Sequence, residues 1–165
     1  MIDFSTPFTA AMLQSIELQM AWSLFIAAFL GALMGIERSM AGKQAGMRTY
    51  ALVSLGSCIF VSIGTLASYL FVGDFVGVNP LQIAGSIAIG IGFIGSGLAV
   101  LRGDQHAELT TASGIWVVAG VGMACGFGFY TLAIAATAIS IAILSLFLRV
   151  ENKLRRKNPP QYPLQ

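Results

Sequence analysis

The chain consists of long apolar blocks separated by short polar segments. Blocks without a charged residue cover residues 18–36, 50–72, 81–101 and 109–148. A helix needs about 20 apolar residues to cross the hydrocarbon layer of a bilayer, so each of the first three blocks predicts one transmembrane helix. The blocks are continuously apolar and lack the alternation of membrane β-barrel strands. The pattern therefore predicts an all-α, polytopic membrane protein.

The last apolar block is too long to cross the membrane once. At about 1.5 Å per residue, a helix over 109–148 would be roughly twice the membrane thickness. Glycine tolerates the backbone angles of a tight turn, which places the predicted turn at Gly126-Phe127-Gly128. This divides the block into spans 109–125 and 129–148. The sequence thus predicts one domain, residues 18–148, that forms a bundle of five transmembrane helices.

Composition supports a lipid environment and narrows the function classes. The chain is 56% hydrophobic and 10% charged, with a mean hydropathy of +0.82, whereas a soluble domain carries about 25% charged residues. No charged residue lies inside a predicted span, which disfavours a proton- or ion-coupled transporter. No Walker loop, nucleophile elbow or zinc-ligand spacing occurs. We therefore expect no enzymatic activity, no cofactor and no nucleic-acid partner.

The basic residues predict the orientation of the bundle. All nine lysines and arginines fall in the first loop, the third loop or the C-terminal segment, which share one side of a five-span protein. Basic loops stay in the cytoplasm. The N-terminus is therefore predicted outside, with residues 1–17 as a short outer segment in which 4–16 form an interfacial helix. Residues 149–165 are predicted to be a basic cytoplasmic tail, and no cleaved signal peptide is expected.

Small residues recur at four-residue spacing within the predicted spans. Gly31 and Gly35 do so in the first span, and Gly122 and Gly126 in the fourth. Helices in lipid associate where small residues allow their backbones to approach closely. We expect these glycines to pack helices within the monomer, and the same spacing leaves a homo-oligomer open.

The third span is rich in glycine, with Gly90, Gly92, Gly95 and Gly97 close together. Residues 90–95 match the dinucleotide-binding pattern, but that pattern needs a preceding strand in a soluble βαβ unit. We therefore reject nucleotide binding. The glycines indicate close helix crossing, and the alternative is a locally unwound helix whose carbonyls line a cavity.

Polar residues near the predicted cytoplasmic ends provide candidate sites. Glu37 and Arg38 follow the first span, and Glu37 is expected to pair with Arg48 or Arg102 if it is partly buried. Snorkelling of these side chains to the interface is the simpler interpretation.

The third loop carries Asp104, His106 and Glu108. In an extended loop these alternate residues would share one side and could bind a divalent cation, although solvation is the simpler interpretation. Thr110 and Thr111 are expected to cap the start of the fourth helix. Cys58 and Cys125 are predicted at different depths, which disfavours a disulfide.

Several of these segments occur together in a specific order. They are Gly35-Ile36-Glu37-Arg38, Ala45-Gly46-Met47-Arg48-Thr49, Gly90 to Gly97, and Leu109-Thr110-Thr111-Ala112 through Trp116. From about Trp22 to Leu148 the chain resembles the MgtC/SapB family of bacterial inner-membrane proteins.

The resemblance implies a five-span, multi-pass protein of the bacterial inner membrane that is linked to adaptation to low magnesium and to virulence. It favours regulation of other membrane proteins, with ATP synthase among the implied partners, over direct magnesium transport. The positions that match the family's motifs, and that the resemblance implies are functional, are Glu37, Arg38, Gly46, Arg48, Thr49, Thr110 and Thr111.

The chain departs from the family pattern in two places. Many members carry a soluble C-terminal domain, whereas this sequence stops at Gln165, so the resemblance implies nothing here about what that domain does. Glycine commonly precedes the Leu-Thr-Thr segment, and Glu108 stands there instead, which changes the charge of the loop.

Three functions are compatible with these features. The first is a non-enzymatic regulator that contacts a membrane-protein partner through its helices. The alternative is a small oligomeric transporter or channel for a cation or small solute. The third is a membrane-organising module whose basic tail binds anionic lipid.

Overall fold

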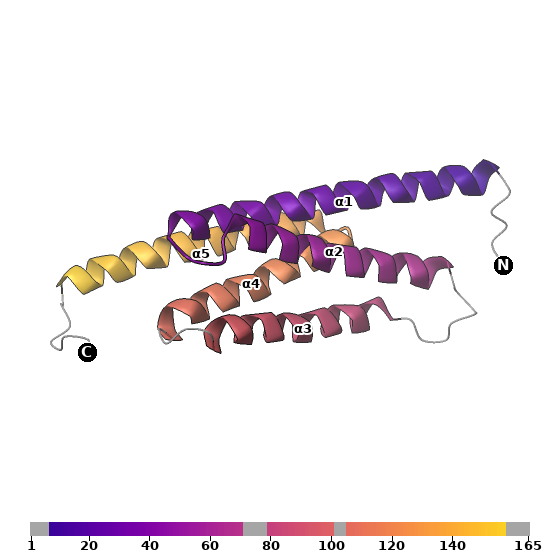
Figure 1. The fold of residues 1–165 in the computed structure, drawn as a ribbon. Coiled ribbons are helices and arrows are strands. Elements are labelled where there is room, and N and C mark those ends of the chain that lie inside the picture. The colour runs from indigo at the N-terminus through magenta and orange to yellow at the C-terminus, as the bar shows by residue number, and fades with distance from the viewer. Residues whose placement is uncertain (1–6, 71–78, 101–104, 158–165) are drawn as a thin grey trace.

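The computed structural model describes residues 7–70, 79–100 and 105–157, and every regular element in these ranges is an α-helix (Figure 1). The helices are α1 (Pro7–Met40), α2 (Met47–Leu70), α3 (Pro80–Val100), α4 (Gln105–Gly126) and α5 (Tyr130–Lys157). All five are long and apolar enough to cross a membrane. The predicted five-helix membrane fold is confirmed.

The core of the bundle lies between α1, α2 and α4. Helix α4 contacts each of the other four helices, whereas α3 contacts α2 and α4, and α5 contacts α1 and α4. Most of the side chains that are almost completely buried come from these three helices, and they include Ala27, Met34, Tyr50, Cys58, Val61, Ile115, Val118, Val121 and Cys125; Ala133 of α5 is also fully buried. Helices α3 and α5 therefore flank a packed three-helix centre.

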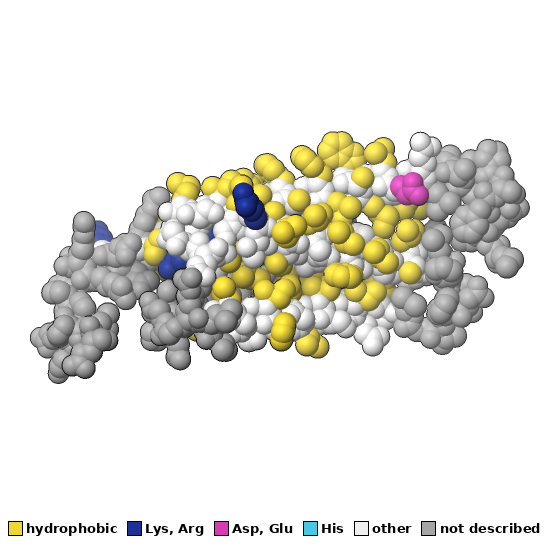
Figure 2. Space-filling model, viewed as in Figure 1, with side chains coloured by type: hydrophobic (Ala, Val, Ile, Leu, Met, Phe, Trp, Pro, Cys, Tyr) yellow, Lys and Arg dark blue, Asp and Glu magenta, His cyan; other side chains and the backbone are white. Residues whose placement is uncertain are grey.

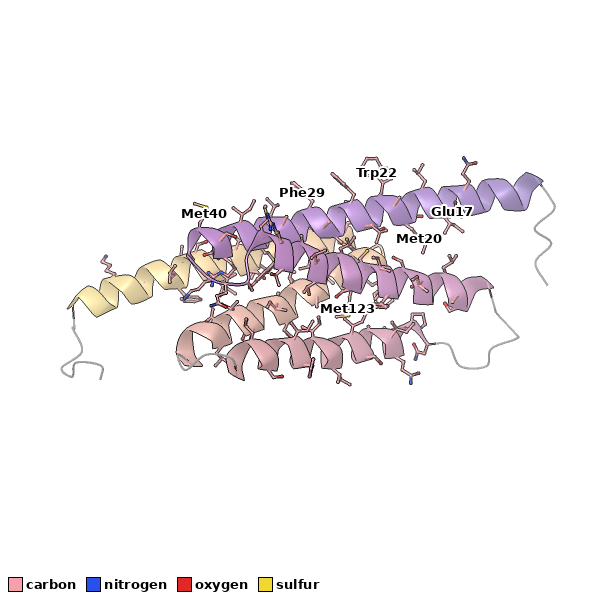
Figure 3. The ribbon with its side chains drawn as sticks, viewed as in Figure 1. Glu17, Met20, Trp22, Phe29, Met40 and Met123 are labelled. Carbon is pink, nitrogen blue, oxygen red and sulfur yellow. The ribbon has the colours of Figure 1, made fainter. Side chains whose placement is uncertain are left out.

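The outer surface of the bundle is apolar. Figure 2 shows hydrophobic side chains along the middle of the helices, with Lys and Arg atoms toward one end and acidic atoms toward the other. Trp22 and Phe29 point away from the neighbouring helices (Figure 3) and are exposed. Such a surface indicates a lipid environment, because exposure of so much contiguous apolar area to water is unfavourable.

Helices α1 and α5 extend well beyond the spans that hydropathy predicts. Residues 7–17 are the first turns of α1, so the short outer segment and its interfacial helix do not form a separate element. Helix α5 continues to Lys157, so residues 149–157 of the predicted tail are helical. Hydropathy marks only the part of a helix that lies in hydrocarbon. The internal hydrogen bonds of a helix let it continue past that boundary.

The α4–α5 turn lies where glycine predicted it. Gly128 has a φ of 79°, and the Phe129 N–H donates to the Ala124 carbonyl at 2.8 Å while the Gly128 N–H donates to the Cys125 carbonyl. This is the glycine-terminated helix end known as the Schellman motif. The predicted turn at Gly126-Phe127-Gly128 is confirmed.

Helix α1 ends in the same motif. Gly42 has a φ of 68°, and the Lys43 N–H donates to the Arg38 carbonyl at 3.0 Å. The short connection that follows turns the chain back into α2. This turn positions the polar end of α1 against the start of α2.

Candidate functional site

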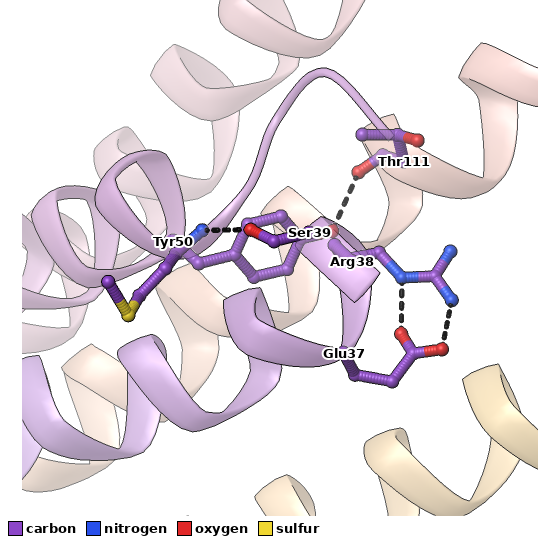
Figure 4. Close-up of polar contacts among 6 residues, drawn as sticks. Glu37, Arg38, Ser39, Tyr50 and Thr111 are labelled. Atoms are coloured by element: carbon purple, nitrogen blue, oxygen red, sulfur yellow. Dashed lines mark hydrogen bonds and ion pairs between the residues drawn. The ribbon is translucent and has the colours of Figure 1, made fainter. Parts of the chain in front are cut away.

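A buried ion pair lies at the end of α1. The Arg38 side chain is only 2% exposed, and its Nε and Nη2 atoms donate to the Glu37 Oε2 and Oε1 atoms at 2.5 and 2.7 Å (Figure 4). A carboxylate that accepts two parallel N–H bonds is the strongest partner for a guanidinium. The predicted partner of Glu37 was Arg48 or Arg102. Glu37 instead pairs with its neighbour, Arg48 is exposed, and Arg102 lies outside the described residues.

A second polar contact links α2 to α4 beside this pair. The fully buried Tyr50 hydroxyl donates to the Thr111 carbonyl at 3.3 Å. Any side chain at Gly114 would overlap the Tyr50 hydroxyl. Gly114 therefore creates the space that the tyrosine ring occupies, and the contact joins the starts of the two helices.

The connection between α1 and α2 is held by close backbone approach. A Cβ atom at Gly35 would lie 2.5 Å from the Met47 Cα atom, and the Ser39 hydroxyl accepts a hydrogen bond from the Met47 N–H at 3.1 Å. This hydroxyl satisfies one of the free N–H groups at the start of α2. We refer to Glu37, Arg38, Ser39, Tyr50 and Thr111 together as the junction cluster; Figure 4 shows them meeting where α1, α2 and α4 come together.

The structure brings together only some of the predicted polar residues. Glu37, Arg38 and Thr111 belong to the junction cluster, whereas Arg48 and Thr110 are exposed and Thr49 is half-buried. Thr110 and Thr111 were expected to cap α4. They lie inside this helix, because α4 begins at Gln105. Residues 105–108, which precede the apolar block, already form the first turn of this helix.

The proposed cation ligands do not share an extended loop. Asp104 lies outside the described residues, and positions 106 and 108 fall in the first turn of α4. Residues two apart on a helix do not face each other. Among the residues whose side chains the structure describes, no group of three His, Cys, Asp or Glu could hold a metal ion.

The four glycines predicted to pack helices all lie against α2. Cβ atoms at Gly31 and Gly126 would lie 2.8 Å from the Ser54 and Val61 Cβ atoms. Gly35 meets the start of α2, as described above, and a side chain at Gly122 would overlap the Ser54 backbone. These glycines let α1 and α4 approach α2 closely along its length, and Gly35 does so beside the junction cluster.

The glycines of α3 behave differently. The helix is continuous from Pro80 to Val100, so the unwound alternative does not describe it. A Cβ atom at Gly90, Gly92 or Gly97 would meet nothing within 4 Å, and only Gly95 faces α4, at 3.5 Å from Ala112. The expected close crossing within the chain is therefore absent at the first three. They face outward because α3 packs on one side only.

Sequence reasoning missed Tyr50, Ser39 and Gly114. Tyr50 opens a long apolar block and was counted as part of its hydrophobic length. A buried tyrosine hydroxyl needs a hydrogen-bond partner, and this requirement could have marked Tyr50 as a polar contact between helices. Gly114 and Ser39 carried no comparable signal, because their roles depend on which helices meet.

The junction cluster provides charge pairing and hydrogen bonding. Its guanidinium is neutralised by Glu37, and the hydroxyls of Ser39 and Tyr50 both make backbone contacts. The arrangement holds the ends of α1, α2 and α4 together.

Comparison with known proteins extends over most of this bundle. The model of the MgtC family matches residues 24–153. YhiD of Escherichia coli strain K12 is 38% identical over 137 residues, which cover 82% of this chain and 63% of YhiD. Protein SrpB of Synechococcus elongatus is 34% identical over 145 residues, covering 81% of this chain and 78% of SrpB.

Protein MgtC of Salmonella typhimurium strain LT2 is 39% identical over 127 residues, covering 77% of this chain and 51% of MgtC. The chain thus spans about half to two thirds of the length of MgtC and YhiD. No solved structure matches it.

Proposed function

The chain belongs to the MgtC family of membrane proteins, and on this basis we propose that it is a non-enzymatic regulator of other proteins in the bacterial inner membrane. It would serve adaptation to low magnesium, as the motifs shared with the family suggest. Its partner would be another membrane protein, for which ATP synthase is the first candidate.

The observation that supports contact with a partner is the exposed side of α3. Phe93 is 81% exposed, and Gly90, Gly92 and Gly97 leave the surface beside it without side-chain bulk. In lipid, a helix face of small residues allows another helix to approach closely. The junction cluster meanwhile fills the end of the central helices, which favours a contact protein over an open conduit.

Site-specific photocrosslinking in cells tests this proposal. A photoreactive residue replaces Phe93 on α3. In the matched control it replaces Phe25 on α1, a residue of the same type that is 65% exposed. We expect crosslinks from position 93 to a different membrane protein, with fewer from position 25. Crosslinks to copies of this chain alone would contradict the regulator proposal.

The link to magnesium needs a separate test. A strain that lacks this protein should grow poorly in low magnesium and recover when the intact chain is restored. Gly92→Leu adds bulk to the exposed side of α3 and should fail to restore growth while remaining folded. Full recovery of growth by this variant would show that the exposed side of α3 is not needed for growth in low magnesium.

A second candidate is a small oligomeric transporter or channel for a cation or small solute. It is favoured by the name of YhiD, which describes that relative as a proposed magnesium transporter. Purified chain reconstituted in liposomes should then move Mg²⁺ or another ion across the membrane. Liposomes that remain impermeable would remove this candidate.

A further inference from the structure

A polar recess lies at the other end of the bundle from the junction cluster. It has a cavity volume of about 240 Å³ and lies between α1, α2 and the α4–α5 turn. Its polar lining consists of Gln19, Ser23, Ser62, Thr65 and Tyr130, together with the backbone of Gly126, Phe127 and Gly128. A concentration of hydroxyl groups is unusual in this bundle, whose other surfaces are mostly apolar.

The recess exists because the α4–α5 hairpin is shorter than the helices beside it. Gly126, the last residue of α4, packs against Cys58 and Val61 of α2, whereas α2 continues for nine more residues to Leu70. At 1.5 Å per residue this is about 13 Å. The irregular backbone of the turn therefore faces the space between the longer helices α1 and α2. Near the membrane, such backbone is tolerated where it lines a polar cavity.

Three hydroxyls of the recess, on Ser23, Thr65 and Tyr130, use their protons in hydrogen bonds and keep lone pairs. Ser23 donates to the Gln19 carbonyl at 3.0 Å, and Thr65 donates to the Val61 carbonyl at 2.9 Å. Because the Ser23 proton is used, the 2.6 Å contact between Ser23 and Tyr130 takes its proton from the tyrosine. The three oxygens can still accept hydrogen bonds or coordinate a cation.

The helix ends beside the recess do not set this preference. The C-terminus of α4 carries partial negative charge and the N-terminus of α5, which begins at Tyr130, carries partial positive charge, and both lie in the wall of the recess. Of the described residues that line it, none is charged. Magnesium and calcium sites normally include carboxylates. Uncharged hydroxyl and carbonyl oxygens, which replace a hydration shell in potassium-selective filters, suit a monovalent ion.

We propose that this recess binds a monovalent cation, either an alkali-metal ion or a primary ammonium group, through Ser23, Thr65 and Tyr130. This assignment is independent of the regulator proposal, because it concerns the opposite end of the bundle and needs no partner protein. It also differs from magnesium transport in the charge of its ligand.

Binding of radioactive Rb⁺ to the purified full chain in lipid nanodiscs tests the site. We expect saturable binding that potassium or methylammonium displaces and that equimolar Mg²⁺ does not. Competition by potassium but not by methylammonium would identify an alkali-metal site, and the reverse would identify an ammonium site. Absence of saturable Rb⁺ binding together with no displaceable methylammonium binding would overturn the proposal, as would displacement by Mg²⁺ at lower concentration than potassium.

Variants locate the ligand in the recess. Thr65→Val keeps the shape of the side chain but removes its oxygen, and should weaken the binding of the monovalent probe by roughly tenfold, equivalent to about 1.4 kcal/mol. Tyr130→Phe keeps the ring and should act in the same direction. Thr137→Val is the matched control, because Thr137 also donates to a helix carbonyl, that of Ala133 at 2.8 Å, but does not line the recess.

We expect Thr137→Val to change binding by less than about twofold. Equal losses in Thr65→Val and Thr137→Val would show a general effect of removing hydroxyls and would overturn the assignment. If Thr65→Val does not fold, Tyr130→Phe decides the question, and unchanged binding in that variant would place the ion elsewhere.

Discussion

The guanidinium of Arg38 is a buried charge at the edge of a lipid-embedded bundle, and Glu37 is its partner at 2.5 Å. A buried charge is tolerated when its hydrogen-bonding groups are paired. The pair comes from consecutive residues, so it requires no particular position of another helix. Arg38 can therefore stay neutralised while α1, α2 and α4 adjust around it.

Removing the carboxylate should be strongly destabilising. Glu37→Gln keeps the size of the side chain but leaves Arg38 buried without its counter-charge, and we expect a loss of about 3 kcal/mol in the free energy of unfolding. Unfolding in mixed micelles with increasing SDS measures it. Arg48→Gln is the control, because Arg48 is exposed and should change stability little.

The double variant Glu37→Gln/Arg38→Met separates charge from packing. Replacing both members of a buried pair by uncharged groups is often nearly neutral, so this variant should recover most of the lost stability. A double variant as unstable as Glu37→Gln would contradict the assignment of the loss to an unpaired charge.

The tyrosine contact between α2 and α4 should contribute less. Tyr50→Phe removes the hydroxyl that donates to Thr111, and we expect a loss of about 0.5–1 kcal/mol because interhelical hydrogen bonds in lipid are modest. The same SDS titration measures it. A loss as large as that of Glu37→Gln would mean that the hydroxyl has a further role.

At the scale of helices, glycines in small-residue repeats of the same spacing have opposite surroundings: Gly35 follows Ala27 and Gly31, and Gly92 stands between Ala88 and Ser96. Gly35 faces the backbone of α2, whereas Gly92 faces nothing within 4 Å. Spacing alone did not distinguish them, because a four-residue repeat defines a stripe on a helix without saying what the stripe faces. Which side of α3 is covered depends on the position of α4.

Alanine substitutions at Gly35 and Gly92 should therefore change the stability of the protein in different ways. Gly35→Ala forces a Cβ atom against Met47 and should destabilise the bundle by about 1–3 kcal/mol. Gly92→Ala meets no neighbour within the monomer and should be neutral, or stabilising by up to about 1 kcal/mol through helix propensity. Thermal unfolding followed by circular dichroism compares the two. Destabilisation by Gly92→Ala would point to contacts of α3 outside the monomer.

The turn between α4 and α5 depends on its glycine for a different reason. Gly128 has a positive φ of 79°, which an L-residue adopts at a cost of about 1–2 kcal/mol. Gly128→Ala should therefore destabilise the protein by about this amount, although open space surrounds the position. Gly120→Ala, also in open space but in a helix, should not, and equal effects in a thermal-unfolding comparison would refute the backbone explanation.

At the scale of the whole molecule, the number of helices and the α4–α5 turn could be predicted from the sequence. Both depend on lengths that the membrane imposes, which a linear pattern records. The ends of α4 and α5 could not, because residues 105–108 and 149–157 are mostly polar or charged, and the continuity of α1 could not, because Glu17 interrupts its apolar run. The junction cluster was predicted in part: Glu37, Arg38 and Thr111 were named, but Tyr50 and the direct Glu37–Arg38 pairing depend on packing between helices.

The orientation of the bundle remains a prediction with a direct test. The distribution of basic residues places the C-terminal segment in the cytoplasm. A cysteine at position 153, where Lys153 is exposed, should react with a membrane-impermeant maleimide only after cells are opened. A cysteine replacing the exposed Glu17 should react in intact cells, provided that the outer membrane, where present, is made permeable. The reverse pattern of labelling would invert the topology.

The position of α4 has a consequence for how the protein is made. Helices leave the ribosome in order, and α1 and α2 can associate as soon as both have entered the membrane. Helix α3 enters next and can pack only against α2. Its second neighbour, α4, which contacts all the other helices, is inserted after it. We expect this interval during synthesis to be the stage at which quality-control proteases remove defective copies, so that changes in α4 lower cellular abundance more than changes in α3.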